Sequence, residues 1–97
     1  MWIINKFNKM ISEFAKITGV TEESILGKDR KNSMTDTRHL YWYFLNEKAK
    51  FSVSEIAKLC NRDHSSITHG IEKIRGYLDS GDKWTVEMWN KVKNIEV

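Results

Sequence analysis

The stretch Asn61-Arg62-Asp63-His64-Ser65-Ser66-Ile67 decides the fold. It follows a short apolar run that opens with a Ser52-x-x-Glu55 capping box, and it precedes a second apolar run that ends near Leu78. Asn61 tolerates the left-handed backbone conformation that a sharp turn between two helices requires. Two short helices joined in this way, with polar side chains opening the second, are typical of a helix-turn-helix. The stretch therefore predicts a motif that reads DNA with the first residues of its second helix.

Helical periodicity continues on both sides of this stretch. Apolar side chains recur at spacings of three and four from Ile3 to Thr18, and Gly19 stands where a C-terminal cap belongs. Thr21 predicts the start of a short helix that ends at Gly27. Further helices are predicted from about 35 to 49, over 53–60, from 63 to a stop at 81, and from about 83 to 96. With no strand pattern, the sequence predicts an all-α, compact helix-turn-helix domain of about six helices.

Composition limits the classes of protein that fit. The chain has 97 residues, 40% hydrophobic and 11% aromatic, which favours one folded domain spanning 1–97 over a disordered segment. No apolar run is long enough to cross a bilayer, and no signal peptide is recognisable, so we expect no membrane partner. A lone Cys60 cannot form an internal disulfide and favours a reducing cytoplasm. The net charge of +3 is only mildly basic, so local charge matters more than the sum.

The second helix of the motif carries the candidate contacts. Ile67 is expected to anchor it in the core, and the hydroxyl and imidazole side chains on its other face are expected to be exposed. Short hydroxyls let the helix approach DNA closely, and histidines can donate to base or phosphate acceptors. Asp63 is expected to cap this helix, although its carboxylate could also accept a hydrogen bond from a cytosine amino group. On spacing alone, the histidines could equally be ordinary surface residues.

A resemblance to a known family rests on these residues. Arg62-Asp63-His64-Ser65-Ser66-Ile67 is followed by His69 and by Glu72-Lys73-Ile74, and it is preceded by Gly27-Lys28-x-Arg30, Arg38 and Ser54-Glu55-Ile56. From about residue 11 to 74 the chain resembles the C-terminal DNA-binding domain of the bacterial replication initiator DnaA.

The resemblance implies a Trp-repressor-like fold and a docking mode. The helix that begins at Asp63 would read the major groove of a short origin sequence, the DnaA box. Arg30 would enter the adjacent minor groove and Arg38 would contact the DNA, and a bacterial protein of this kind would associate with the nucleoid. We further expect Lys28, Lys31 and Arg38 to anchor phosphates, with help from Arg62 at the backbone. The predicted DNA-binding residues are Lys28, Arg30, Lys31, Arg38, Arg62, Asp63, His64, Ser65, Ser66, Thr68 and His69.

The chain also departs from the family pattern. Asp29, Asp36 and Thr37 replace basic or proline positions, and Asn46 stands where the family has a lysine. The recognition turn is one residue shorter than the usual glycine-glycine turn. Fewer cationic contacts should lower the affinity for DNA and weaken its dependence on salt.

Other chemistries fit less well. The chain has no Gly-x-x-x-x-Gly-Lys-Ser/Thr phosphate loop, so we expect a freestanding DNA-binding module that is not an enzyme and uses no nucleotide or cofactor. Such a module could regulate replication, compete for origin sites or belong to a mobile element. Cys60, His64 and His69 are residue types that bind zinc. However, the cysteine is expected on the apolar side of its helix and the histidines on the exposed side of the next helix. We therefore expect no metal site.

A second hypothesis is a protein-interaction module or transcriptional regulator that kept the fold but binds DNA weakly. The acidic substitutions Asp29 and Asp36 motivate it, together with the aromatic run 41–44. This run is either core or a contact patch, since exposed aromatic side chains favour interfaces. Trp84 fits the core stripe of the last helix, with Trp89 at its edge. The candidate protein contacts are Tyr41, Trp42 and Trp89.

Overall fold

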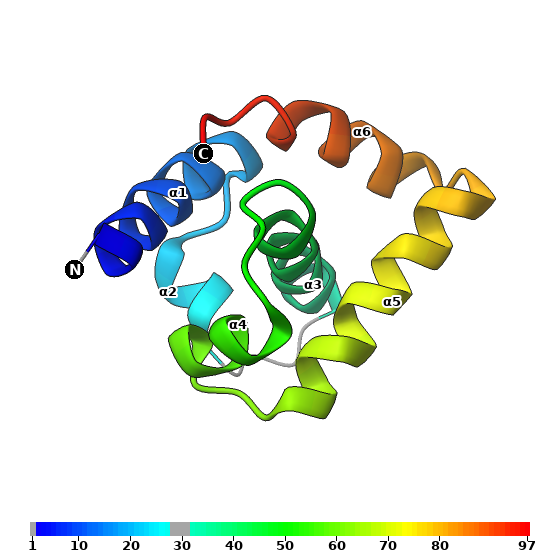
Figure 1. The fold of residues 1–97 in the computed structure, drawn as a ribbon. Helices are drawn as coiled ribbons and strands as arrows, with labels where there is room; N and C mark the ends of the chain where they lie inside the picture. Colours follow the sequence, from blue (N-terminus) through cyan, green and yellow to red (C-terminus); the bar gives the residue numbers. More distant parts are fainter. Residues whose placement is uncertain (1, 28–31) are drawn as a thin grey trace.

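The computed structural model describes residues 2–27 and 32–97, and Figure 1 shows their arrangement. The helices are α1 (Trp2–Thr18), α2 (Glu22–Leu26), α3 (Asn32–Glu47), α4 (Val53–Cys60), α5 (His64–Ser80) and α6 (Lys83–Val92). These two ranges contain no strand, so the all-α prediction is confirmed. None of their helices combines the length and the apolarity that a bilayer crossing needs.

Helix α3 lies at the centre, and all five other helices pack against it or around it (Figure 1). The six consecutive residues 40–45 are all buried, none with more than 9% of its surface exposed. A helix can bury consecutive side chains only when other elements cover it on every side. The aromatic run is therefore core. Tyr41 and Trp42 are 0% and 2% exposed, so the core interpretation of the run is confirmed and its alternative, a protein-contact patch at these two residues, is wrong.

Local capping signals fix the ends of the helices around the turn. The Ser52 hydroxyl accepts the Glu55 backbone N–H at 3.1 Å, and the Glu55 carboxylate accepts the Ser52 N–H at 2.9 Å, which is the predicted capping box. Asn61 ends α4 with φ 53°, in the left-handed region. Gly81 ends α5 with φ 76°, as a glycine C-cap does. These predictions are confirmed.

Two helix boundaries differ from the predicted ones. Helix α3 begins at Asn32 rather than near residue 35, because apolar periodicity marks the buried face of a helix and not its polar first turn. Helix α6 ends at Val92 rather than near residue 96. There the Ile95 N–H bonds to the Val92 carbonyl at 3.0 Å in a turn, and this turn brings Ile95 into the core with 8% of its surface exposed.

Candidate nucleic-acid interface

Helix α5 is anchored along one face and open along the other. Ile67, Ile71 and Ile74 are buried, at 0%, 4% and 0% exposed, and they hold the helix on the core. The opposite face begins with polar side chains that the packing leaves in solvent. Of the predicted contacts on this helix, Thr68 is half-buried and the exposed ones are His64, Ser65, Ser66 and His69. The structure therefore leaves the polar side chains at the start of α5 in solvent, as a major-groove reader requires.

Asp63 occupies the N-cap position of α5, but its side chain does not close the helix end. Its backbone is extended (φ −76°, ψ 156°), and within the described residues its carboxylate makes no capping hydrogen bond. Instead it accepts the Ser65 hydroxyl at 3.1 Å. The hydroxyls of Ser66 and Ser65 lower the pKa of the Asp63 carboxyl, so it is ionised at neutral pH. Within the described residues the first turn of α5 thus has no side-chain cap from its N-cap residue.

The residue that precedes this cap, Arg62, is engaged with the protein. Its guanidinium donates from Nη2 to the carbonyl of Gly27, the C-cap of α2. It also lies over the indole of Trp42, 5.8 Å from the ring centroid. The side chain is half-buried. Its predicted role at the DNA backbone is untested, but its place in the structure is a bridge between the turn and α2.

Helix α5 approaches α3 closely at Gly70. A Cβ at this position would lie 2.7 Å from Cε3 of Trp42 and 2.8 Å from Cδ2 of His39, which is closer than real Cβ atoms come. The glycine thus lets the recognition helix lie directly on the two rings. Burial, aided by the positive charge of Lys73, lowers the pKa of His39 to about 4, so its imidazole is neutral at pH 7. Burial raises the pKa of the Cys60 thiol to about 11.

Arg38 does not lie where a phosphate anchor was expected. It is 4% exposed, and its guanidinium donates from Nε to the Ile25 carbonyl at 3.0 Å and from Nη2 to the Ser24 carbonyl at 2.8 Å. Helix α2 packs over the start of α3 and covers this side chain, an effect that no local sequence signal reveals. Arg38 therefore ties α2 to α3 and is not part of the exposed contact surface in this structure.

The basic residues Lys28, Arg30 and Lys31 lie outside the described residues, so their contribution stays a prediction. The elements on either side are described: α2 ends at its C-cap Gly27, and α3 begins at Asn32.

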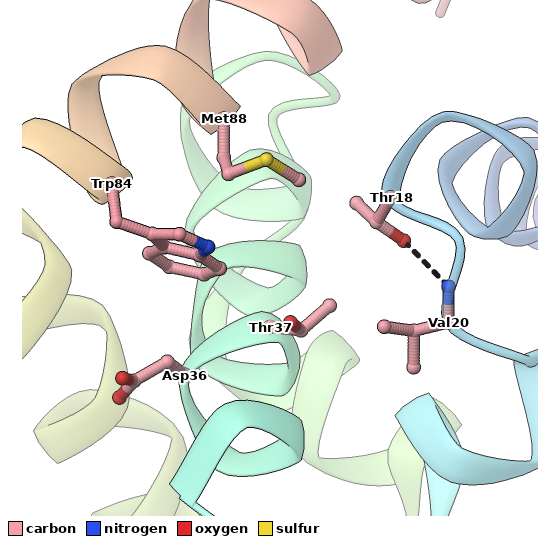
Figure 2. A pocket seen from close by; sticks show the side chains of 6 residues that line it. All are labelled: Thr18, Val20, Asp36, Thr37, Trp84 and Met88. Carbon is pink, nitrogen blue, oxygen red and sulfur yellow. Dashed lines mark hydrogen bonds between the residues drawn. The ribbon is translucent and has the colours of Figure 1, made fainter.

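A pocket of about 400 Å³ lies on a different part of the molecule, between the end of α1, the first turns of α3 and the start of α6 (Figure 2). Trp84 points into it and is 38% exposed, so the prediction that Trp84 belongs to the core stripe is wrong. Trp89 instead packs edge-on against Tyr43 of α3, with ring centroids 4.8 Å apart. None of the lining residues comes from α4 or α5; they are Thr18, Val20, Asp36, Thr37, Trp84 and Met88.

Comparisons with known proteins agree with this geometry. The family model described as "Bacterial dnaA protein helix-turn-helix" matches residues 7–74, a range that includes α4, the turn and the first turns of α5. The chromosomal replication initiator protein DnaA of Kosmotoga olearia is 31% identical over 85 residues, which are 88% of this chain and 19% of that protein. DnaA of Pseudothermotoga lettingae is 30% identical over 74 residues, 76% of this chain and 17% of that protein.

The chain thus spans less than a fifth of the length of these two relatives. The family match, however, covers well over half of the chain and contains α4, the turn and the start of the recognition helix. The chain belongs to the bacterial DnaA helix-turn-helix family, a family of DNA-binding domains.

Proposed function

We propose that this protein binds double-stranded DNA sequence-specifically, at a site like the DnaA box, in replication initiation or its regulation. The main support is the exposure pattern of α5. The polar residues His64, Ser65, Ser66 and His69 are exposed to solvent, whereas the apolar face of the helix is buried in the core. An α-helix of this kind fits the major groove, and its first residues reach the base edges. The two relatives described above are named as chromosomal replication initiators, and this supports the biological setting.

In this proposal the contacts divide into two classes. The side chains of His64, Ser65 and Ser66 contact bases, and the open first-turn N–H groups contact a phosphate. His69 and Thr68 lie further along the same helix. Arg30 enters the adjacent minor groove, and Lys28 and Lys31 hold phosphates. Arg38 is left out of this set because its guanidinium is buried on backbone carbonyls.

The proposed activity is recognition without nucleotide hydrolysis. The 97 residues contain no phosphate loop, so any ATP-driven step would have to be supplied by another protein or segment.

A fluorescence anisotropy titration tests the proposal, using a DnaA-box duplex and a scrambled duplex at low and moderate salt. We expect micromolar or tighter binding with a clear preference for the box, and an affinity that falls as salt rises. Equal affinity for both duplexes would remove the sequence-specific part of the proposal. Absence of binding at low salt would remove DNA binding altogether.

A second candidate function is a protein contact, and the pocket of Figure 2 favours it. The exposed indole of Trp84 and the carboxylate of Asp36 line the same pocket, and both attract cations. Such a pocket suits a lysine or arginine side chain of a protein partner. If the chain fails to bind DNA at low salt, this candidate becomes the leading one. It then predicts that an arginine-containing peptide quenches the fluorescence of Trp84, with Trp84→Phe as the variant that assigns the signal.

A further inference from the structure

Arg62 joins two parts of the chain that are far apart in sequence. It stands between Asn61, which makes the left-handed turn, and Asp63, which begins the recognition helix. Its guanidinium donates to the carbonyl of Gly27, the residue immediately before the basic segment 28–31. One side chain therefore connects the start of the recognition helix to the C-cap of α2.

Trp42 supports this connection from the core. Its ring is 2% exposed, and the Arg62 guanidinium lies 5.8 Å from the ring centroid, within the range of a cation–π interaction. The same ring sets the approach of α5, because a Cβ at Gly70 would lie 2.7 Å from its Cε3 and 2.9 Å from its Cζ3. Trp42 thus touches the backbone of the recognition helix and the cation that reaches α2.

We infer that Arg62 is a positioning residue, which fixes the start of the recognition helix relative to the C-cap of α2 through Trp42 and the Gly27 carbonyl. The inference rests on the proposed function, since Gly27 directly precedes the proposed DNA contacts Lys28, Arg30 and Lys31 in the sequence. A protein that contacts two grooves at once gains affinity when both contacts are held in place before binding. In this role Arg62 acts through the protein, whereas a phosphate contact would act directly on the DNA.

The chemistry of the bridge suits arginine. A guanidinium is planar, so one face can lie over an indole while an edge N–H donates to a carbonyl. A lysine keeps the positive charge but cannot make both contacts in the same geometry. The variant Arg62→Lys therefore separates positioning from simple charge.

The first experiment measures DNA affinity by anisotropy for wild type, Arg62→Ala, Arg62→Lys, Arg30→Ala and the double variant Arg62→Ala/Arg30→Ala. Arg75→Ala serves as the matched control, since Arg75 is an exposed arginine on α5 outside the proposed contact set. We expect Arg62→Lys to weaken binding nearly as much as Arg62→Ala. We also expect the loss caused by Arg30→Ala to be at least ~3-fold smaller once Arg62 is absent, because contacts that depend on each other are not additive.

The opposite result would overturn the inference. If Arg62→Lys binds like wild type and the two single losses multiply in the double variant, Arg62 is a direct phosphate contact. Circular dichroism and thermal unfolding of each variant establish that the helices are retained.

The second experiment needs no DNA, so it decides the bridge even if the proposed function fails. Amide hydrogen exchange is followed at Gly27, whose N–H bonds to the Glu23 carbonyl at 2.8 Å in the free protein. Arg62→Ala and Arg62→Lys should both accelerate exchange at Gly27 by ~10-fold if the bridge holds the end of α2 closed, while Arg75→Ala should not. Unchanged exchange at Gly27 in both Arg62 variants would show that the bridge positions nothing.

Discussion

Helices α5 and α6 both have an aspartate as N-cap residue, but in the part of the chain that the structure describes only the aspartate of α6 accepts a backbone N–H of its own helix. We call the start of α6 the closed helix end and the start of α5 the open helix end. At α6 the Asp82 carboxylate accepts the Thr85 backbone N–H at 3.1 Å and the Thr85 hydroxyl at 2.7 Å. Thr85 is fully buried. At α5 the Asp63 carboxylate accepts the Ser65 hydroxyl at 3.1 Å, and within the described residues it makes no capping hydrogen bond to a backbone N–H of α5.

The difference distinguishes a structural helix end from one that is ready for a ligand. The first-turn N–H groups of a helix lack intrahelical partners, and they are satisfied by a cap, by water or by a ligand. In α6 the protein supplies the partner and buries the threonine that completes it. In α5 it leaves the first turn in solvent with hydroxyl and imidazole groups around it, which is the arrangement that a phosphate or a base edge can occupy.

The largest expected effect on DNA affinity comes from replacing His64, the first residue of α5, by alanine. His64→Ala should weaken binding to the cognate duplex by about 1–3 kcal/mol and reduce discrimination against a scrambled duplex. Lys83→Ala, at the first position of α6, is the matched control and should change the specific affinity little. Anisotropy titrations on both duplexes measure the two variants side by side. Equal losses of affinity for His64→Ala and Lys83→Ala on the cognate duplex would mean that the open end of α5 is not the recognition surface.

A smaller effect, on stability, is expected at the closed end. Thr85→Val removes the buried hydroxyl that bonds Asp82 and should lower the free energy of unfolding by about 1 kcal/mol. Urea denaturation measures the change, and the affinity for DNA should remain as in wild type. A variant that lost DNA affinity without losing stability would show that the two helix ends are not separate in function.

The helix ends could be predicted from the sequence because their signals are local. The Ser52–Glu55 capping box, Asn61 at the turn and Gly81 after α5 each act within a few residues, and the structure has each of them in its predicted role. The start of α3 has no comparable signal in the pattern, and its predicted boundary was late by about one turn.

Burial in the candidate site could be predicted only where one helix face determines it. The exposed face of α5 follows from the periodicity of Ile67, Ile71 and Ile74. Arg38 and Trp84 could not be placed in this way, because their exposure depends on where α2 and α6 pack. Nor does any pattern reveal that Arg62 reaches the carbonyl of Gly27, which is 35 residues away in the chain.

A modest effect is expected from Ser66, an exposed hydroxyl of the open turn. Ser66→Ala should weaken binding to the cognate duplex by about 0.5–1.5 kcal/mol, the usual net value of one hydrogen bond, and leave thermal stability nearly unchanged. Ser80→Ala is a suitable control, because Ser80 is an exposed serine at the far end of the same helix, where its hydroxyl donates to the Tyr77 carbonyl. If Ser66→Ala bound DNA with wild-type affinity, the Ser66 hydroxyl would make no contact to a base or phosphate, and any such contact in this turn would come from other side chains or the backbone.

The smallest expected effect is the response of the closed end to acid. The Thr85 hydroxyl and N–H hold the pKa of Asp82 below its ordinary value of 3.8. A carboxyl whose pKa is lower in the folded state stabilises the fold above its unfolded pKa, and this contribution is lost as the pH falls through the folded pKa. The loss should therefore appear only below about pH 4.

Thr85→Val removes the hydroxyl, which is the largest cause of the shift, so the pKa of Asp82 should rise toward its ordinary value. The difference in stability between wild type and Thr85→Val should then be constant from pH 7 to about pH 4 and shrink below it. Carboxyl chemical shifts in an NMR titration report the pKa, and urea denaturation at each pH reports the stability. If both proteins lost stability in parallel down to pH 3, the ionisation of Asp82 would add nothing to the stability that the Asp82–Thr85 contact provides. The two helix ends would then differ in hydrogen-bond geometry alone.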